Sequence, residues 1–323
     1  MTRVADYLDL VRAPASLTVL GDAVVGALSA RGSGGDSPLR GGALAASSVC
    51  LYSAGMALND WADADLDALE RPERPIPSGR ITRSRALAVG AGLTALGIGS
   101  AFAAGRASGL VSLALAGALW AYDLVFKPTA AGPVVMAVCR GLDVMMGAAG
   151  PGWRGALLPA GAVAVHTVAV TAVSRGEVDG STRVTGGAAV AASVAVAASG
   201  LLGGGGASGR PDGARAAAAL GGARAAAALG GPRAAAALGG ARAAAALGGA
   251  RYLAAVLPGY LAVAGEASAS NSRDATRAGI RAVVPLQSAL AARAGSPVAT
   301  LALLGVEVAG RLLGRRRSRG DIT

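Results

Sequence analysis

The residues best suited to chemistry lie between Asn59 and Arg80, in a chain otherwise rich in alanine, glycine, valine and leucine. Asn59, Asp60, Asp63 and Asp67 form the core of this stretch. If the segment is helical, the three aspartates at i, i+3 and i+7 share one face. Clustered carboxylates repel one another, and beside hydrocarbon they cost more still. Bound hard cations relieve both problems, and Mg²⁺, which takes oxygen ligands and accompanies phosphates, fits best.

The alternative is a solvated acidic loop whose carboxylates pair with Arg71 and Arg74. That interpretation would be favoured for an arbitrary acidic run. Here the flanks favour the metal site, because an apolar segment leads into the aspartates and a Pro77-Ser78-Gly79 turn follows them.

The elements that position this stretch are predicted to be membrane-spanning helices. The chain has 323 residues, of which 53% are hydrophobic and only 15% charged, whereas soluble proteins have about a quarter charged residues. Several uncharged windows are about 17–20 residues long, enough for a helix to cross a bilayer. Their apolar runs are continuous rather than alternating, which argues against a β-barrel. We therefore expect an all-α polytopic membrane protein.

We predict nine spans, or ten if the short 279–292 segment, which contains Arg281, also crosses. Residues 1–15 are expected to form an interfacial helix, without the layout of a cleavable signal peptide. A polar loop is expected at 266–281. The predicted spans are 17–30, 43–58, 86–104, 108–125, 130–150, 156–173, 186–202, 251–265, 279–292 and 297–313.

The chain is predicted to be a single domain, 1–323, interrupted by a low-complexity insertion at 205–250. Within the insertion a G-G-A-R-A-A-A-A-L unit recurs every nine residues. Nine residues turn an ideal helix through about two and a half turns, so successive arginines alternate between opposite faces and no amphipathic stripe forms. We expect this segment to have no catalytic role.

The net charge of +11 is interpreted as loop arginine following the positive-inside rule, which predicts that the loops 71–85 and 175–183 are cytoplasmic. No aromatic-basic motif suggests nucleic-acid binding. Both cysteines, Cys50 and Cys139, lie in apolar runs, so buried thiols are expected rather than a disulfide.

The acidic stretch from Asn59 to Arg80 and several shorter motifs resemble those of the UbiA superfamily of intramembrane prenyltransferases. Asn59-Asp60-x-x-Asp63-x-x-x-Asp67, followed by R-P-E-R-P-I-P-S-G-R at 71–80, is similar to the superfamily's first aspartate-rich motif. Tyr122-x-x-x-x-Lys127 resembles its Y-x-x-x-x-K element. Further similarities are Arg12-Ala13-Pro14 and Arg140 with Gly141 and Gly147.

The second site differs from the D-x-x-x-D found in most of the superfamily. This chain has S-R-G-E-V-D at 174–179, which resembles the EboC-like bacterial branch. Glu177 and Asp179 are two residues apart, so they do not share a helical face and a loop is expected. One of the two magnesium positions implied by the resemblance therefore has an altered ligand set.

The resemblance implies transfer of a prenyl group from a prenyl diphosphate to an aromatic or lipid acceptor, in contact with membrane lipids of a bacterial plasma membrane. Mg²⁺ is the implied cofactor, and the ions stabilise charge on departing pyrophosphate. The implied metal ligands are Asn59, Asp60, Asp63, Asp67 and Glu177. The implied catalytic residues are Asp60, Asp63, Asp67, Lys127 and Arg140. The implied substrate-binding residues are Asn59, Arg74, Tyr122, Arg175 and Asp179.

Other polar residues have simpler interpretations. Tyr122 and Lys127 also suit an interfacial anchor and a snorkelling lysine. Arg140 and Asp143 could form a structural pair across one helical turn. His166, alone in an apolar run, is expected to pack between helices. Trp61, Trp120 and Trp153 are expected at membrane interfaces.

Two other functions remain open. A lipid-handling or export-associated protein could keep the fold and bind an isoprenoid diphosphate without transferring it, and the altered second motif motivates this alternative. A diphosphate phosphatase or cyclase on the same scaffold is a third.

Overall fold

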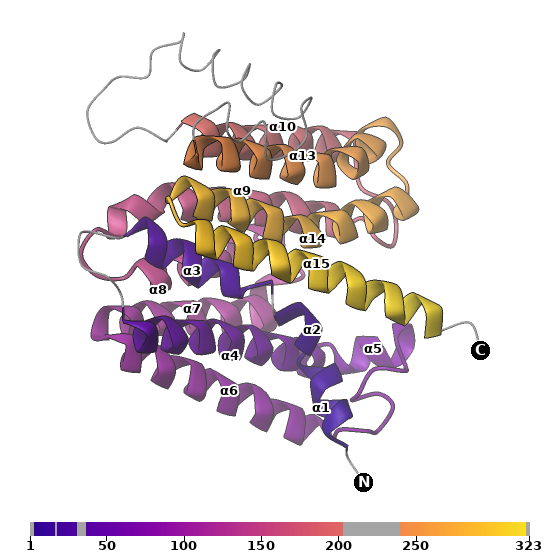
Figure 1. Ribbon diagram of the computed structural model, residues 1–323. Coiled ribbons are helices and arrows are strands. Elements are labelled where there is room, and N and C mark those ends of the chain that lie inside the picture. Colours follow the sequence, from indigo (N-terminus) through magenta and orange to yellow (C-terminus); the bar gives the residue numbers. More distant parts are fainter. Residues whose placement is uncertain (1–2, 17, 31–36, 203–239, 321–323) are drawn as a thin grey trace. The chain divides into compact units, whose positions relative to one another are not determined.

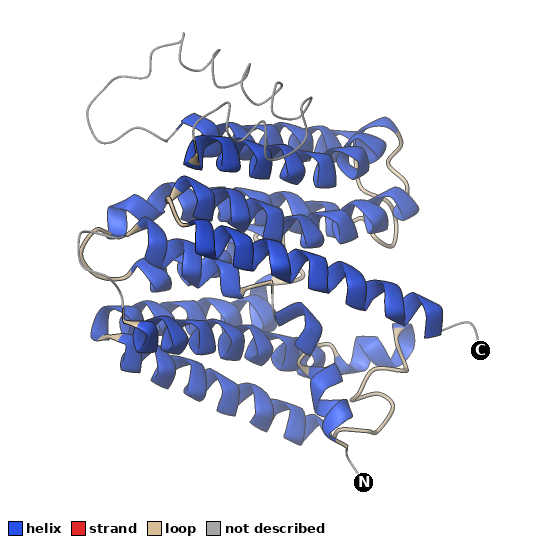
Figure 2. Ribbon diagram, viewed as in Figure 1, coloured by secondary structure: helices blue, strands red, loops and turns tan. Residues whose placement is uncertain are grey.

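The computed structural model describes residues 3–16, 18–30, 37–202 and 240–320, and every regular element within these ranges is helical (Figures 1 and 2). The chain divides into two compact units, residues 1–160 and 161–323. The predicted all-α fold is confirmed for the described residues.

The first unit has ten helical elements among its described residues, of which η1 is a π turn and η2 a 3₁₀ turn. In order they are α1 (Val4–Leu10), α2 (Ala13–Ser16), α3 (Leu20–Ser29), α4 (Pro38–Ala62), α5 (Ala64–Glu70), α6 (Arg83–Ala104), α7 (Arg106–Ala121), η1 (Tyr122–Phe126), α8 (Gly132–Ala148) and η2 (Trp153–Ala156).

Local sequence explains where the long helices of this unit begin and end. Ser37 caps α4 by accepting a hydrogen bond from a backbone amide, and proline follows at the first helical position, where its missing N–H costs nothing. Thr82 caps α6 in the same way. Gly105, at φ 150°, makes the turn between α6 and α7, a backbone conformation that glycine adopts most easily.

Close backbone packing holds α3 against α8. A Cβ atom on Gly26 would lie 1.9 Å from the Val144 carbonyl oxygen, and one on Gly147 would lie 2.1 Å from the Ala23 carbonyl oxygen. Small residues permit such approach, the usual basis of helix packing in membranes. Elsewhere in the unit, α4 packs along α6 and α7 along α8 (Figure 1).

The described part of the second unit contains α9 (Leu157–Ser174), which begins at the end of the first unit, and four further helices. These are α10 (Arg183–Leu202), α13 (Ala241–Gly265), α14 (Ala269–Arg293) and α15 (Pro297–Gly320). Helix α13 packs against both α10 and α14, and α15 packs against α14. An ion pair at 2.7 Å between Arg251 and Glu307 joins α13 to α15.

A buried polar contact lies inside the second unit. His166 of α9 donates from Nε2 to the Gly279 carbonyl at 3.1 Å, because a carbonyl can only accept, and its Nδ1 accepts from the Tyr252 hydroxyl at 3.0 Å. A side chain at Gly279 would collide with the Tyr260 hydroxyl, 2.7 Å from the Cβ position. His166 is thus buried between helices, as its packing interpretation expects.

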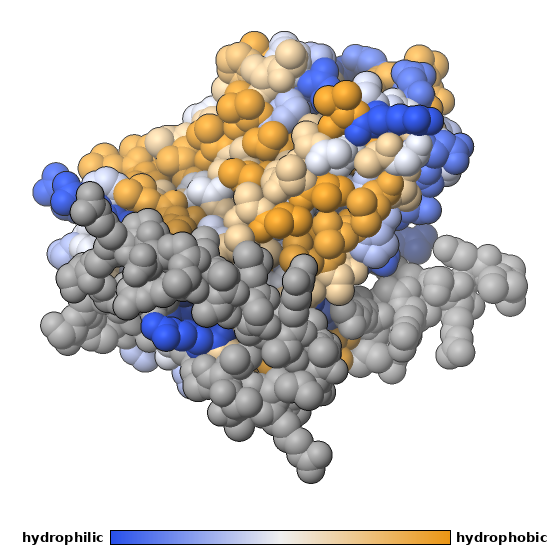
Figure 3. Space-filling model, turned by 90° about the horizontal axis from the view of Figure 1, so that it is seen from above, coloured by the Kyte–Doolittle hydropathy of each residue, from blue (hydrophilic) through white to orange (hydrophobic). Residues whose placement is uncertain are grey.

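Five described helical segments are long and apolar enough to cross a membrane: Pro38–Ala62, Arg83–Ala104, Arg106–Phe126, Trp153–Ser174 and Arg242–Gly265. Shorter apolar helices are Leu20–Ser29, Arg183–Ser199 and Pro297–Val308. Large hydrophobic side chains such as Leu96, Leu110 and Leu261 are exposed, and much of the surface visible in Figure 3 is hydrophobic. These features indicate a multi-pass membrane protein; the count of nine or ten spans stays a prediction.

The structure changes three sequence-based boundaries. The N-terminal segment is two helices rather than one, because the chain turns sharply at Arg12. The predicted polar loop 266–281 is largely helix, since Ser268 caps α14 and the helix starts at Ala269. The predicted insertion 205–250 lies outside the described residues up to 239, but residues 241–250 already belong to α13. The single-domain prediction is not tested by this arrangement.

Candidate functional site

The acidic motif occupies the junction of α4 and α5. Asn59 and Asp60 lie in the last turn of α4, Asp63 separates the two helices, and Asp67 lies in α5. Backbone hydrogen bonds from Asp63 to Asn59 and from Asp67 to Asp63 continue the helical course across the junction. Asp60 and Asp67 are buried, at 3% and 1% exposure. The segment is therefore largely helical and partly buried rather than a solvated loop, but the pairing with Arg74 that the alternative interpretation expected is present.

Arg74 joins the two buried carboxylates. Its Nη1 lies 3.2 Å from Asp60 Oδ1 and 2.6 Å from Asp67 Oδ2. The guanidinium comes from the turn that follows α5, and hydrogen bonds from Ser78 and Gly79 back to earlier carbonyls of that turn hold the loop in place. Two of the three predicted metal-binding aspartates thus converge on one cation.

Arg12 adds a second cation to Asp60, which the sequence did not assign to the site. Its Nη2 lies 3.0 Å from Asp60 Oδ1. Arg12 has φ 47°, the one non-glycine residue with positive φ among the described residues. Such strain is kept only where surrounding contacts fix it, and it is frequent at functional sites. The turn between α1 and α2 therefore serves to direct this side chain toward the acidic motif.

Asp63 pairs with a different cation. Lys127 Nζ contacts Asp63 Oδ2. Lys127 follows η1, where its backbone amide bonds the Tyr122 carbonyl in the five-residue spacing of a π turn. Single π turns inside helices are often found at functional sites. The structure thus brings together the two sequence motifs that contain Asp63 and Lys127, while Tyr122 lies half-buried at the start of the turn.

Asp123 is a further carboxylate that sequence reasoning missed as a site residue. It is 8% exposed, and its Oδ1 accepts a hydrogen bond of 3.3 Å from Asn59 Nδ2. Because the Asn59 amide nitrogen donates this hydrogen bond, the oxygen of the same side-chain amide stays available as an acceptor. The available signal was position, because Asp123 lies inside the Tyr122–Lys127 element.

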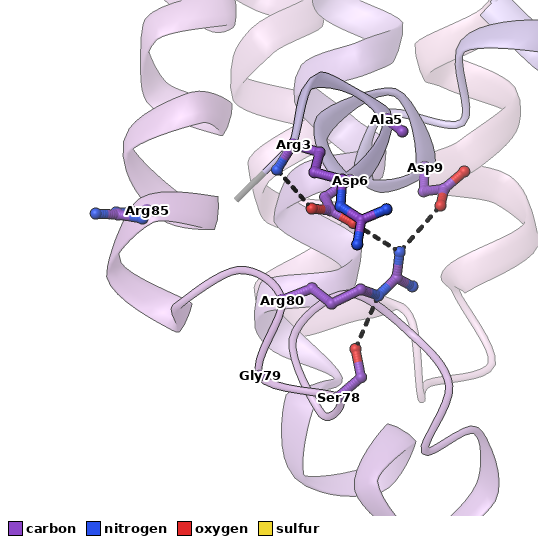
Figure 4. Close-up of a pocket in the computed structure, with 8 residues that line it drawn as sticks. All are labelled: Arg3, Ala5, Asp6, Asp9, Ser78, Gly79, Arg80 and Arg85. Carbon is purple, nitrogen blue, oxygen red and sulfur yellow. Dashed lines mark hydrogen bonds and ion pairs between the residues drawn. The ribbon is translucent and has the colours of Figure 1, made fainter. Parts of the chain in front are cut away.

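Arg80 links α1 to the turn that contains Ser78 and Gly79 (Figure 4). Arg74 belongs to the same turn. Its Nη1 lies 3.0 Å from Asp6 and 3.1 Å from Asp9, and its Nε donates to Ser78. The surrounding surface pocket has a volume of about 640 Å³. The hydrogen bond from the Arg3 backbone amide, and then that from Arg80, lower the pKa of the Asp6 carboxyl, and the hydrogen bonds that Arg80 donates to Asp9 and Asp6 raise the pKa of Arg80.

Arg140 lies in a separate polar cluster of the same unit. Its Nε is 2.9 Å from Asp22 Oδ2 of α3. The prediction that Arg140 pairs with Asp143 across one turn is wrong for the described ion pairs. The close contact between α3 and α8 places Asp22 nearer to the guanidinium, whereas Asp143 contacts Ser48.

The residues of the second motif lie in the second unit, in the turn after α9. The predicted loop at 175–180 is confirmed. Arg175 and Asp179 are exposed and Glu177 is half-buried. The turn is attached to the start of α14, since Arg273 donates to the Glu177 carbonyl at 2.7 Å and Ser272 accepts from the Ser181 amide at 3.1 Å.

The donor chemistry of the first motif fits Mg²⁺, since the available ligands are carboxylate and amide oxygens. Among the described residues, however, no three His, Cys, Asp or Glu side chains converge closely enough to hold a metal ion. The carboxylates instead contact Arg12, Arg74 and Lys127. Metal binding therefore requires these basic side chains to move away from the aspartates.

Comparison with known proteins gives matches at the level of family and fold. Residues 19–179 match the UbiA prenyltransferase family. Digeranylgeranylglyceryl phosphate synthase of Ignicoccus hospitalis is 35% identical over 124 residues, 38% of this chain and 39% of that protein. The chain thus spans less than half of the length of the curated relatives it matches, between 18% and 42% for the digeranylgeranylglyceryl phosphate synthases.

Two solved structures share the fold. A UbiA homolog from Aeropyrum pernix K1 aligns with a TM-score of 0.58 and 18% identity, over 85% of this chain and 96% of that one. A UbiA homolog from Archaeoglobus fulgidus, bound to DMAPP and Mg²⁺, aligns with a TM-score of 0.52 and 19% identity, over 67% and 84%. At these identities the likeness concerns the fold alone.

Proposed function

We propose that this chain, as a member of the UbiA superfamily, transfers a prenyl group from a prenyl diphosphate to a hydrophobic acceptor within the membrane. The observation that supports this most directly is the cluster of carboxylates and basic side chains at the α4–α5 junction. It combines oxygen ligands for a divalent cation with three cations that suit an anionic phosphate. Apart from Arg12, the cluster lies inside residues 19–179, the segment that matches the prenyltransferase family.

Asn59, Asp60, Asp63 and Asp67 would hold Mg²⁺, and Glu177 would contribute at the altered second site. When bound, Mg²⁺ would supply electrostatic stabilisation of the negative charge on the leaving diphosphate. Once these carboxylates no longer hold the nearby basic side chains, those side chains would be available to phosphate oxygens. The candidate phosphate-binding side chains are Arg12, Arg74, Lys127, Arg140 and Arg175.

The remaining site residues would orient other side chains and the substrate, and the surrounding helices would exclude water. Asp123 would orient the Asn59 amide, and Tyr122 and Asp179 are proposed substrate contacts. In the transfer, the bond between prenyl C1 and the diphosphate oxygen breaks, and C1 bonds an acceptor carbon or oxygen. The acceptor loses a proton and pyrophosphate departs. The apolar helices would keep water from capturing the electron-deficient carbon.

The solved homolog bound to DMAPP and Mg²⁺ supports this substrate and cofactor class, and the synthase from Ignicoccus supports a lipid as the acceptor to test first. On the S-R-G-E-V sequence we assign the chain to the EboC-like bacterial branch. We place it in the bacterial plasma membrane, with the loops 71–85 and 175–183 cytoplasmic.

The altered second motif favours a second candidate, a protein that binds an isoprenoid diphosphate without transferring it. Glu177 and Asp179 are two residues apart on a turn, one half-buried and the other exposed. A working transferase needs the half-buried Glu177 to substitute for the missing aspartate.

The test is pyrophosphate release by the purified full chain in detergent, with Mg²⁺, geranylgeranyl diphosphate and a panel of aromatic and lipid acceptors. Asp60→Asn and Asp67→Asn are expected to lower the rate at least about 100-fold. Asp65→Asn is the matched control, because Asp65 belongs to the same stretch but its side chain is 89% exposed and pairs with Arg83.

Acceptor-dependent release that falls with Glu177→Ala would support transfer with a shortened second site. Mg²⁺-dependent binding of the diphosphate without release, across the whole panel, would support the binding protein instead. Equal rates for Asp60→Asn, Asp67→Asn and Asp65→Asn would reject the assigned site.

A further inference from the structure

The polar cluster between α3, α4 and α8 contains more acid than base. Its charged members are Asp22 of α3 with Arg140 and Asp143 of α8, and Ser48 of α4 completes it. Asp22 is 0% and Asp143 5% exposed. The glycine contacts between α3 and α8 bring these groups together. The cluster thus has two buried carboxyl groups but only one guanidinium, which forms an ion pair with Asp22.

The two hydrogen bonds of the Ser48 hydroxyl require one more hydrogen than that hydroxyl carries. Ser48 Oγ lies 2.6 Å from Asp143 Oδ2 and 3.2 Å from the Val19 carbonyl oxygen. A serine hydroxyl has one hydrogen, and a carbonyl can only accept. If the Ser48 hydrogen goes to Val19, the hydrogen between Ser48 and Asp143 must come from Asp143.

The other arrangement leaves Asp143 ionised and accepting from Ser48. The 2.6 Å separation alone would permit it. However, Asp143 Oδ1 is buried without a hydrogen-bond partner among the described residues. An ionised carboxylate would then be buried with one hydrogen bond on one oxygen, close to a second carboxylate, and without an ion pair of its own. Burying a charge in that way is costly.

We propose that Asp143 is a neutral carboxylic acid in the folded protein, donating a hydrogen bond to Ser48, which in turn donates to the Val19 carbonyl. The relay ties α8 to α4 and to the residue that precedes α3. Because a neutral Asp143 does not compete for the guanidinium, Arg140 remains paired with Asp22. Asp143 is therefore a positioning residue for Arg140, whether or not the chain transfers prenyl groups.

The charged and titratable groups around Asp143 are few. Asp22 faces it from α3, and Arg140 and Cys139 lie near it on α8. From α4 the contact is Ser48, a hydroxyl that stays neutral. The cluster with a protonated Asp143 has one acid and one base, and so is neutral overall, as the low-dielectric interior of a membrane protein favours.

Infrared difference spectroscopy of the full chain near neutral pH tests the protonation state. We expect the wild-type minus Asp143→Asn spectrum to contain the carbonyl band of a protonated carboxylic acid, shifted in D₂O. The exposed Asp65 supplies the control, because wild type minus Asp65→Asn should show only carboxylate bands. A difference for Asp143→Asn confined to the carboxylate bands would overturn the proposal.

Ser48→Ala gives a second, independent measurement if Asp143→Asn does not fold. A neutral Asp143 loses its acceptor in this variant, so its carbonyl band should remain and move to higher frequency. If Asp143 is ionised in the wild type, the wild-type minus Ser48→Ala spectrum will contain no acid band contributed by the wild type.

The stability of two substitutions tests the hydrogen bond between Asp143 and Ser48. Asparagine is isosteric and neutral, and its amide can donate to Ser48, so Asp143→Asn should melt within about 2 °C of wild type in detergent. Asp143→Ala removes the relay and should melt at least about 3 °C lower. Equal losses in the two variants would contradict the proposed hydrogen bond.

Discussion

Replacing Arg74 by alanine should destabilise the protein mainly through Asp67. Arg74 is the ion-pair partner of Asp67 among the described residues, at 2.6 Å, and the Asp67 side chain is only 2% exposed. Asp60 is less affected, because Arg12 still contacts it at 3.0 Å. The substitution therefore leaves one buried carboxylate without a counter-charge.

The size of the effect follows from burial. Removing one partner of a fully buried ion pair costs about 3–5 kcal/mol. Arg74 is 17% exposed, so water can reach part of the vacated space, and we expect a loss of about 2–3 kcal/mol in the free energy of unfolding. For a chain of this size that corresponds to a fall of about 4–10 °C in apparent melting temperature.

The assay is thermal unfolding of the purified full chain in one detergent at one heating rate, without added divalent cations. Arg71→Ala is the matched control, since Arg71 is exposed three residues away and should change stability by less than about 0.5 kcal/mol. Adding Asp67→Asn to Arg74→Ala should recover most of the loss, because no unpaired charge then remains. Equal melting of the two arginine variants, or no recovery by Asp67→Asn, would refute the reasoning.

Three further outcomes are expected. The pKa of Asp6 is lowered from its ordinary value of 3.8, so the ionised Asp6 side chain stabilises α1 fully above pH 3.8 and loses this effect as the pH falls through the folded-state pKa. Amide hydrogen exchange in α1 should therefore become faster over that pH range. The change should be smaller in Arg80→Gln. Gly147→Val should abolish monodisperse elution in size-exclusion chromatography, because its Cβ position overlaps a backbone oxygen of α3, whereas Gly117→Val, with open space around it, should not. His166→Leu should cost about 1–3 kcal/mol in thermal unfolding, because it removes the buried hydrogen bonds of His166 with the Tyr252 hydroxyl and the Gly279 carbonyl.

Hydropathy and the acidic motif predicted much of the fold, because both depend on local composition. The long apolar segments became helices such as α4, α6 and α7, and the aspartates lie at the end of the second predicted span. Helix boundaries near polar sequence were less predictable. The start of α14 depends on the N-cap residue Ser268. The surrounding stretch contains several other serines and polar residues, so the sequence does not indicate which of them caps the helix.

The pairing of charges could not be predicted, because it depends on contacts between distant segments. Arg12 reaches Asp60 across 48 positions, and only the strained backbone at Arg12 directs it there. Asp22 displaced Asp143 as the expected partner of Arg140 because glycines let α3 approach α8. Sequence spacing indicates which residues share a helical face, but not which cation on another helix will reach them.

The π turn at Tyr122–Phe126 makes residue count a determinant of the site. Each residue added to or removed from a helix rotates everything beyond it by about 100°. The π turn absorbs one extra residue, since the Lys127 amide bonds the Tyr122 carbonyl over five positions rather than four. As a regular α-helix the same residues would rotate Lys127 by about 100° and away from Asp63, although every charged side chain and the mean hydropathy would be unchanged. Two helices with identical site side chains, one containing this π turn and the other regular throughout, would therefore present the lysine on different sides and have different sites.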